Sequence, residues 1–326
     1  ITTRTIDVEK GGSLWYGMGN DAMNQIGFKV STGLMSNGWA VTILGSRKWG
    51  DGYIQGTNFN SYNYFVNVSK RINDAHQLAF TVFGAPQSHF QRSSYDGLSI
   101  EGWQNVKDWM DGKSMYRYNA TYGFDRHGKQ MSSYYNVYHK PQISLNHTWQ
   151  INETSSLSTA VYVSVASGYG LGGYGRNGYS SSDWYGSSNG VLNTKFRCPD
   201  GTFDYAAIQE MNAASTTGSN MILARKNNNH EWYGLVSSYK KEIGQNNGNK
   251  LNITAGLDVR YYIGHHKNTI ENLMDGEYYI DDANRKQIKA YNSSLAGNYN
   301  YIYQKLGVGH VVARNYCLLY TSPSPR

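Results

Sequence analysis

Residues 251–263 read LNITAGLDVRYYI, and this stretch decides which fold the sequence can adopt. Its apolar side chains stand at every second position: Leu251, Ile253, Ala255, Leu257, Val259, Tyr261 and Ile263. The positions between them are mostly polar or glycine: Asn252, Thr254, Gly256, Asp258, Arg260 and Tyr262. A period of two places successive side chains on opposite faces of a β-strand. The stretch therefore predicts a long strand with one apolar face and one polar face.

The same alternation recurs along the chain, most clearly in residues 26–34 and 157–165. Weaker examples cover residues 12–20, 39–48, 61–72, 76–86, 139–151 and 230–243. Together these segments predict about nine strands of about ten residues each, whereas ordinary strands have about five or six. The chain is therefore predicted to be all-β.

Composition narrows the class of protein. Only 16% of the 326 residues are charged, against ~25% in typical soluble proteins. The net charge of +7 is spread along the chain, so no basic tract predicts nucleic-acid binding. No run approaches the ~18 apolar residues of a membrane-spanning helix, so a membrane role would have to use strands.

The connections between the predicted strands alternate between short and long. Short turns are predicted at residues 35–38, 73–75, 152–155 and 244–249, and long links at 49–60, 87–138, 167–229 and from 264 onward. Neighbouring antiparallel strands joined in this order place the tight turns at one end of a sheet and the long loops at the other. This asymmetry is typical of an antiparallel transmembrane β-barrel with long extracellular loops. A soluble β-sandwich is the competing architecture, and the length of the strands argues against it.

Several segments carry a resemblance to a family. Residues 1–4, Ile-Thr-Thr-Arg, are similar to the end of the plug domain of TonB-dependent outer-membrane receptors. Residues 64–70 (YFVNVSK), 80–87 (FTVFGAPQ) and 139–147 (HKPQISLNH), with Ser46-Arg47, resemble barrel segments of such receptors from Bacteroidota. The resemblance implies a barrel of about 22 strands around an internal plug, of which this chain would hold about nine or ten.

On this resemblance the chain divides into three parts. Residues 1–6 would be the truncated last strand of the plug, and residues 7–316 the first part of the barrel, with short helices in its loops. Residues 317–326, CLLYTSPSPR, break from the Tyr, Gly and Asn texture before them. They match the translation of a transposon-based sequencing adapter, so we expect this tail to be foreign. The plug proper and the segment that contacts the energy-transducing partner are expected to be absent.

The resemblance implies a role in the bacterial outer membrane. The protein would take up a scarce nutrient, such as a siderophore, vitamin or glycan, and would be energised through a TonB-type partner. Its partners would be outer-membrane lipid, that transducer and a small ligand, with no nucleic acid. Two alternatives remain open at this stage, a passive porin-like barrel and a secreted β-sandwich that binds carbohydrate.

The long link at residues 87–138 holds the residues most suited to ligand contact. Ile100, Trp103, Val106, Trp109 and Met110 have the spacing of a short amphipathic helix that begins after Ser99 and ends near Gly112. Aromatic side chains of this link could stack on sugars or on a planar ligand, and we select Trp103, Trp109, Tyr116, Tyr118, Tyr134 and Tyr135. A second helix is predicted at residues 204–214. The links at residues 87–138, 167–229 and 264–295 sum to a net charge of only +1, which favours a neutral or mixed-charge ligand over a polyanion.

Other motifs predict little chemistry. Gly168, Gly170 and Gly173 satisfy the GxGxxG string, but no helix pattern follows, so a flexible glycine-rich loop is expected rather than a dinucleotide site. His265 and His266 are expected as solvated loop residues. An acidic cluster (Asp275, Glu277, Asp281 and Asp282) misses the EF-hand spacing, and a structural cation there is a minor alternative. No catalytic constellation stands out, so the sequence predicts no enzyme, no cofactor and no metal site.

Overall fold

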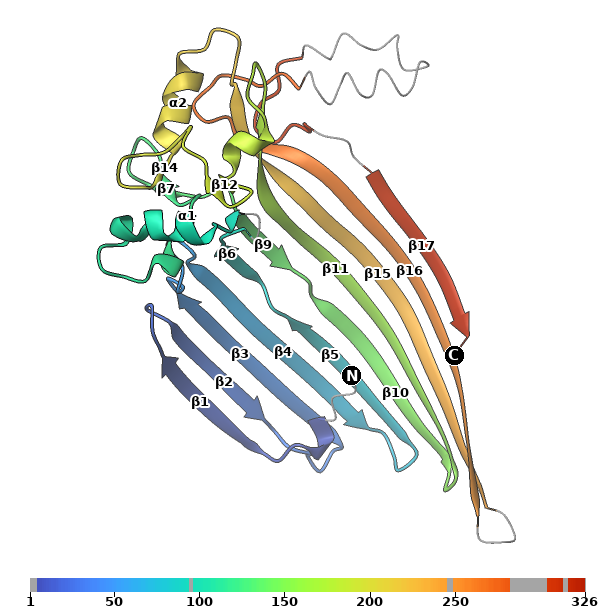
Figure 1. Ribbon diagram of the computed structural model, residues 1–326. Coiled ribbons are helices and arrows are strands. Elements are labelled where there is room, and N and C mark those ends of the chain that lie inside the picture. Colours follow the sequence, from blue (N-terminus) through green and yellow to red (C-terminus); the bar gives the residue numbers. More distant parts are fainter. Residues whose placement is uncertain (1–4, 94–95, 245–248, 282–303, 313–315, 326) are drawn as a thin grey trace, which may run out of the picture.

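A single antiparallel sheet dominates the computed structural model of the chain (Figure 1). The structure describes residues 5–93, 96–244, 249–281, 304–312 and 316–325. The strands follow the order β1-β2-β3-β4-β5-β10-β11-β15-β16-β17, while β6 and β9 extend β5 and β10 beyond short breaks. The prediction of an all-β antiparallel fold is confirmed. Among the described residues, no helix is long and apolar enough to cross a membrane.

The strands of this sheet have the following bounds: β1 Gly11–Met18, β2 Asn24–Ser31, β3 Trp39–Gly50, β4 Phe59–Arg71, β5 His76–Gly84, β6 Gln87–Phe90, β9 Tyr135–His139, β10 Gln142–Asn152, β11 Ser155–Gly175, β15 Met221–Gly244, β16 Lys250–Asn272 and β17 Tyr316–Pro325. The expected plug strand at residues 1–6 lies largely outside the described residues. Its last part belongs to a 3₁₀ turn, η1 (Thr5–Asp7).

One face of the sheet is apolar from strand to strand. Directly paired residues form a continuous row across eight strands: Val30, Ile43, Val66, Val82, Ile143, Val163, Tyr233 and Tyr261. Large side chains on this face are exposed, for example Leu257 at 53% and Val259 at 44%. In the described part of the chain, no second sheet covers them. This contradicts the β-sandwich alternative, in which the apolar stripe would be buried.

The apolar stripe of β16 has the height of a lipid layer. Residues 251–263 at ~3.3 Å per residue and a tilt of ~45° rise about 30 Å, the thickness of the hydrocarbon core. We call this outward-facing stripe the lipid belt.

The opposite face is polar. Its row one residue away holds Ser31, Thr42, Asn67, Thr81, Ser144, Tyr162, Gly234 and Arg260. Thr42 Oγ1 donates to Ser31 Oγ at 3.1 Å, and Asn67 Nδ2 donates to Thr81 Oγ1 at 2.7 Å. The turn η1 packs against β3 and β4. Cross-strand hydrogen bonds thus pair polar side chains on the face that points to the interior of the barrel.

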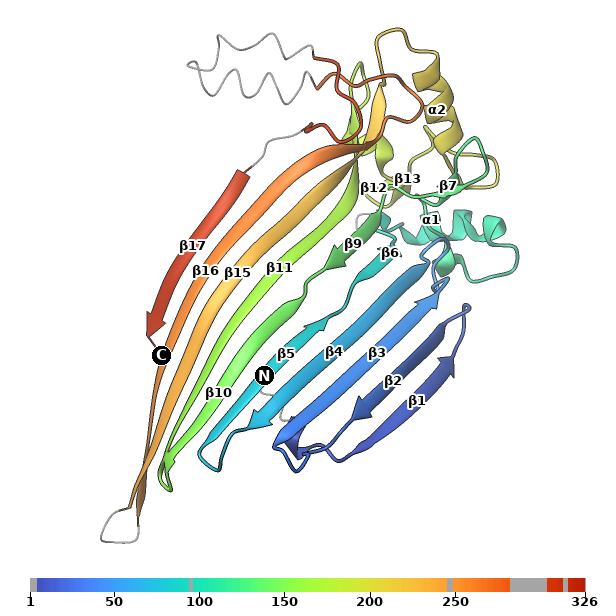
Figure 2. The same ribbon diagram turned by 180° about the vertical axis from the view of Figure 1, so that it is seen from behind.

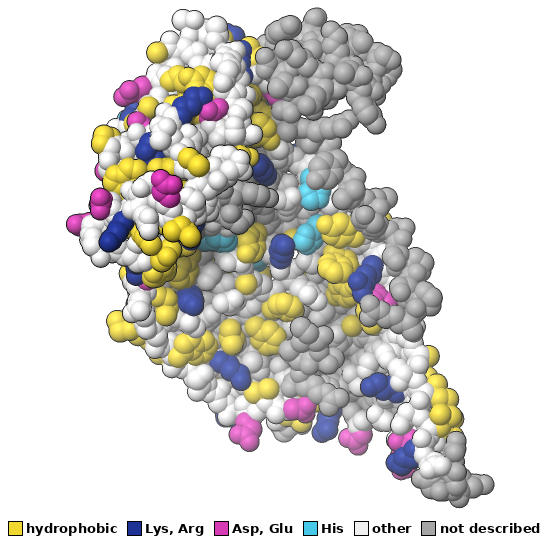
Figure 3. Space-filling view, viewed as in Figure 1, with side chains coloured by type: hydrophobic (Ala, Val, Ile, Leu, Met, Phe, Trp, Pro, Cys, Tyr) yellow, Lys and Arg dark blue, Asp and Glu magenta, His cyan; other side chains and the backbone are white. Residues whose placement is uncertain are grey.

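The connections are arranged as the sequence predicts. The four predicted short turns lie at one end of the sheet and the long excursions at the other, and Figure 2 shows the same division from behind. The short β1–β2 turn is the exception, because it lies at the end with the long excursions. In Figure 3 acidic side chains gather along the edge with the short turns and over the long loops, with very few between them. Lys and Arg side chains are spread over the same face between these two regions.

Three strands are much longer than about ten residues: β11 has 21, β15 has 24 and β16 has 23. The expected loop at Gly168, Gly170 and Gly173 is therefore wrong, because these glycines lie within β11. His265 and His266 likewise lie within β16. Main-chain pairing continues above the lipid belt, where neither face of the strand has to be apolar. The alternation of apolar and polar residues that predicts a strand is therefore lost there.

The long connections fold together into a compact unit, which we call the loop cap. Its elements are α1 (Ile100–Asn105), η3 (Lys107–Met110), η4 (Met115–Arg117), β7 (Gly123–Phe124), β8 (Gln130–Met131), η5 (Ser181–Trp184), β12 (Ser187–Ser188), β13 (Val191–Leu192), β14 (Phe203–Asp204) and α2 (Tyr205–Ala213). The helix predicted at residues 204–214 is confirmed as α2, whereas the one predicted after Ser99 is a short α-helix, α1, followed by the 3₁₀ helix η3. The Ser99 side chain caps α1 by accepting from Gly102 N, and Asp204 caps α2 by accepting from Ala207 N.

Candidate functional site

A buried arginine ties the segments of the loop cap together. Arg197 Nη1 donates to the carbonyl of Ala120 at 2.6 Å, and Nη2 donates to that of Gly186 at 3.2 Å. Its guanidinium also lies over the ring of Phe203, 5.6 Å from the centroid. Burial lowers the pKa of Arg197. The guanidinium replaces water as the partner of several carbonyls, so three chain segments hold one arrangement.

The carboxyl of Asp96 accepts hydrogen bonds from main-chain nitrogens of the loop cap. Its Oδ1 accepts from Gly186 N at 3.0 Å and from Ser187 N at 3.3 Å. Burial raises the pKa of Asp96, although these two donors and the charge of Arg197 oppose the shift. The loop cap is therefore pinned at Gly186 from both sides, by a carboxyl on the nitrogen and by a guanidinium on the carbonyl.

The six predicted aromatic residues fall into two groups. Trp103, Trp109 and Tyr118 pack in one apolar cluster, which Tyr116 joins through Trp103, whereas Tyr134 and Tyr135 stand at the start of β9. Trp103 and Tyr116 meet edge to face, with ring centroids 5.5 Å apart. Trp109 packs on Tyr118, which is only 2% exposed and donates from its hydroxyl to the carbonyl of Gly201. Burial raises the pKa of Tyr118 to about 12. Tyr135 packs instead on Phe90.

Tyr134, the sixth predicted residue, lies beside Ser132, whose Oγ accepts from Tyr134 N. The six side chains therefore do not converge on one surface. Tyr118 supports the loop cap from within, because a residue so deeply buried cannot touch a ligand at the surface.

A polar pocket of about 310 Å³ opens between three connections at the loop end of the sheet. The β1–β2 turn, the β3–β4 link and the segment 109–117 supply its walls. We call it the loop pocket, and it is lined by Asp21, Asp51, Gly52, Tyr53, Ile54, Gln55, Gly56, Trp109, Met110, Asp111, Lys113 and Arg117. Of the predicted aromatic residues, only Trp109 lines it.

Arg117 organises the loop pocket. Its Nη1 lies 2.6 Å from Asp21 Oδ1 and donates to the carbonyl of Tyr53 at 3.0 Å. The guanidinium also lies over the Tyr53 ring, 4.2 Å from the centroid. The hydrogen bond that Arg117 donates to Asp21 raises the pKa of Arg117. Asp21 itself has a φ of 56°, a left-handed conformation that suits the tight β1–β2 turn.

The chemistry of the loop pocket is mixed. Asp51, Asp111 and Lys113 lie on its wall beside the Asp21–Arg117 pair, and Tyr53 and Trp109 offer aromatic surface. Such a lining suits a ligand with both donors and acceptors, and it does not suit a polyanion. Sequence reasoning missed Asp21, Asp51, Tyr53, Lys113 and Arg117, because nothing in their local spacing predicts that three separate connections meet.

The acidic cluster and the paired histidines named from the sequence contact other side chains of the protein. Asp275 forms an ion pair with Arg126, with Oδ2 2.7 Å from Nε, and Asp282 lies outside the described residues. His266 Nδ1 lies 2.7 Å from Asn228 Oδ1. Over the described ranges, His, Cys, Asp and Glu side chains form no group of three or more able to hold a metal ion.

Neither the models of known protein families nor the curated proteins give a match to this sequence. Solved structures do. The open form of the ferric-catecholate import receptor Fiu from E. coli K12 aligns with a TM-score of 0.56 at 9% identity, over 84% of this chain and 38% of that chain. The ferripyoverdine receptor of the outer membrane of Pseudomonas aeruginosa aligns with a TM-score of 0.50 at 9% identity, over 79% and 28%.

The unliganded ferric citrate transporter FecA gives a TM-score of 0.50 at 9% identity, over 82% of this chain and 30% of that chain. The chain therefore shares its fold with part of the β-barrels of these outer-membrane proteins. The chain spans about a third of the length of these structures. At such identities the likeness concerns the fold alone, and the loop pocket has to be judged on its own residues.

Proposed function

We propose that the chain is part of an outer-membrane active-transport receptor for a scarce nutrient, energised by a TonB-type partner. The observation that carries the proposal is the sheet itself. One curved wall has an apolar face of membrane height, a hydrogen-bonded polar face and a packed loop cap at a single end. The solved structures with this fold are named as an import receptor, a transporter and a receptor.

The loop pocket is the proposed point of ligand contact. Its lining of carboxylates, two cations and two aromatic rings favours a neutral or mixed-charge nutrient of small size. The loop cap is preorganised by Arg197 and Asp96, so binding would not have to order the loops first. That arrangement suits a receptor that must capture a dilute solute.

A passive porin-like barrel would present the same wall and loops, so conduction has to separate the two functions. The full-length protein is inserted into planar lipid bilayers and its steady ion conductance is measured. A plugged receptor should hold the conductance near the baseline, whereas a passive barrel should conduct continuously. An open conductance of the intact protein would refute the receptor proposal.

Energy coupling needs a second measurement. Cells that express the full-length protein are given a ferric catecholate, cobalamin or a neutral oligosaccharide, with and without a protonophore. We expect the protonophore to abolish uptake of the accepted nutrient while surface binding persists. Uptake that survives the protonophore would contradict a TonB-type mechanism.

A further inference from the structure

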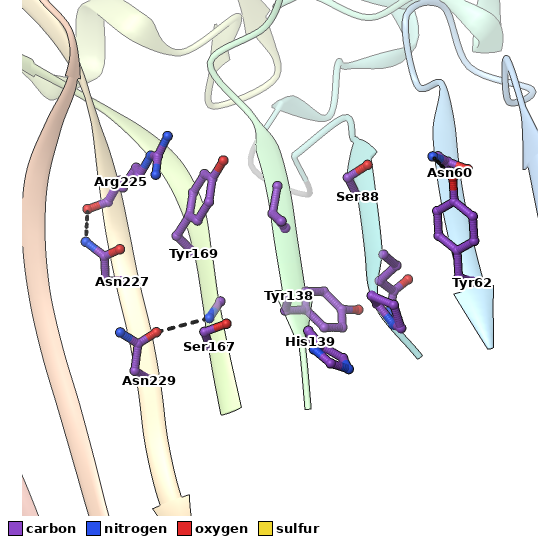
Figure 4. Close-up of a pocket in the computed structure, with 14 residues that line it drawn as sticks. Asn60, Tyr62, Ser88, Tyr138, His139, Ser167, Tyr169, Arg225, Asn227 and Asn229 are labelled. Atoms are coloured by element: carbon purple, nitrogen blue, oxygen red, sulfur yellow. Dashed lines mark hydrogen bonds between the residues drawn. The ribbon is translucent and has the colours of Figure 1, made fainter. Parts of the chain in front are cut away.

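A second hollow lies on the outer face of the sheet, away from the interior of the barrel. Its volume is about 460 Å³, and Figure 4 shows its side chains projecting from neighbouring strands. The side chains that the argument uses are Asn60, Ser88, Ser167, Tyr169, Arg225 and Asn227. Asn60, Ser88, Val137, Tyr169 and Asn227 form one paired row across β4, β6, β9, β11 and β15. We call this the upper hollow.

The face is fixed by register. Along β11, Val161, Val163 and Val165 belong to the lipid belt, and Ser167 and Tyr169 continue the same face because they follow at steps of two. The boundary row pairs Val165 with Glu231, and Glu231 with Ile263. The upper hollow therefore begins where the lipid belt ends, on the side of the loop cap.

A lower hollow of about 470 Å³ lies on the same face within the lipid belt. Its outward side chains are apolar, and they include Phe80, Leu145, Val161, Val163, Leu235 and Val259. Strands β11 and β15 contribute to both hollows. Val163 lines the lower hollow and Tyr169 the upper one, and the strand advances about 20 Å between them. This spacing suits one amphiphilic molecule with its headgroup in the upper hollow and its acyl chains at the lower one.

The lining of the upper hollow suits a saccharide. The Arg225 guanidinium lies over the Tyr169 ring, 4.5 Å from the centroid, and its Nη2 donates to Glu271 Oε1 at 3.0 Å. Asn227 Nδ2 donates to the carbonyl of Arg225, drawn in Figure 4, which fixes the amide beside the hollow. Aromatic rings flanked by amides and hydroxyls provide both stacking and hydrogen bonds for sugars.

A second arginine stands at the opposite edge. Arg47 Nε donates to Asn60 Oδ1 at 3.0 Å, and its guanidinium lies 4.6 Å from the centroid of the Trp49 ring. An exposed cation at this position can meet an anionic group on the sugar, whereas the charge of Arg225 is largely neutralised by Glu271.

We propose that the upper and lower hollows together bind one glycolipid of the outer leaflet, with its saccharide headgroup in the upper hollow and its acyl chains against the lower one. The proposal rests on the proposed placement of the barrel in the outer membrane. It assigns the outer face a specific lipid, independently of the nutrient that enters from the loop side.

The test uses the full-length protein extracted from outer membranes in a mild detergent. After gel filtration, the bound glycolipid is quantified per protein by mass spectrometry. We expect one glycolipid to remain on the wild type, and about tenfold less on a Tyr169→Ala, Asn227→Leu double variant. Arg260→Gln is the matched control, because Arg260 also pairs with a carboxylate, Asp258, and lies over a ring, Trp232, but on the interior face. The control should retain the glycolipid.

A photo-crosslinking amino acid at Ser88 identifies the occupant in living cells. A glycolipid adduct supports the proposal, and an adduct with a protein, or no adduct, overturns it. Equal glycolipid retention by the wild type and the double variant also overturns it. Membrane fractionation and a conductance recording are run on the same samples, so failure of the receptor proposal is recognised separately from failure of this one.

Discussion

The ring of Tyr162 covers Gly234 on the neighbouring strand, and a Cβ placed on Gly234 would lie 2.2 Å from Cζ of that ring. The two residues form a direct cross-strand pair on the interior face, so the glycine makes room for the tyrosine. We predict that Gly234→Val displaces the ring and destabilises the barrel by about 1–3 kcal/mol. The free energy of unfolding of the full-length protein in detergent checks this. Gly17→Val is the control, because a Cβ at Gly17 meets nothing within 4 Å, and equal losses would contradict the explanation.

The orientation of β16 can be tested with one charge on each face. Leu257→Arg places a guanidinium on the lipid belt and should cost about 2–4 kcal/mol, because lipid cannot solvate it. Thr254→Arg, three residues away on the interior face, should cost little. Folding is read from the heat-modifiable band of the membrane-inserted protein. The assignment of faces fails if Thr254→Arg is the more damaging change.

Asp96 should give the loop cap a pH dependence. Its pKa in the folded state is raised by burial, so the folded state binds the proton more tightly than the unfolded chain does. Its contribution to stability is therefore largest below the ordinary Asp value and is lost as pH rises through the raised pKa. We predict that Asp96→Asn removes this slope. Hydrogen exchange of residues 186–187, measured between acid and neutral pH, reports the change.

The hydrogen bonds of Asp96 can be separated from its charge. Asp96→Leu leaves the nitrogens of Gly186 and Ser187 without their carboxyl acceptor, which should cost about 1–3 kcal/mol at every pH. If Asp96→Asn is as damaging as Asp96→Leu, the ionised carboxylate is essential and the expected sign of the pH slope is wrong.

The loop pocket predicts different roles for two tryptophans of the same segment. Trp109 lines the pocket, whereas Trp103 packs on Tyr116 outside it. We predict that Trp109→Ala weakens nutrient binding about tenfold or more, while Trp103→Ala leaves the dissociation constant within about twofold. Binding of a ferric catecholate, cobalamin and a neutral oligosaccharide is measured by fluorescence or calorimetry. A larger loss with Trp103→Ala would move the site away from the loop pocket.

Two prolines of β17 conflict with the central position that a strand has in a closed barrel. Register places Pro323 opposite Val259 and Pro325 opposite Leu257 in β17. Proline cannot donate to a neighbouring strand, and a closed barrel has no free edge to accommodate it. We predict that genomic DNA resequenced across codon 316 encodes an alternating strand without these prolines. A genomic reading that repeats CLLYTSPSPR would refute the foreign origin.

The sequence predicts the wall of the barrel well. Alternation in 251–263 and its relatives marks β2, β3, β10 and β16, because lipid on one side and water on the other impose a strict period of two. The upper parts of β11 and β15 could not be predicted in this way, because the strands pair there without an apolar face. The packing of the loop cap could not be predicted for another reason. Arg197 and Asp96 act through carbonyls and amides far away in the chain, which leave no trace in local spacing.

The candidate site was the least predictable part. Aromatic content selected Trp109, which lines the loop pocket, but it also selected Tyr118, which is buried inside the loop cap. The Asp21–Arg117 pair joins residues 96 positions apart, and only the closing of three connections brings them together.

The length of β15 carries a consequence for how a solute first meets the cell. The strand continues from Glu231, at the top of the lipid belt, to Met221, which is about 25 Å of additional height for a tilted strand. The mouth of the barrel would therefore stand well above the surface of the bilayer. On the proposed placement in the outer membrane, a solute would meet the protein before it reaches the lipid headgroups.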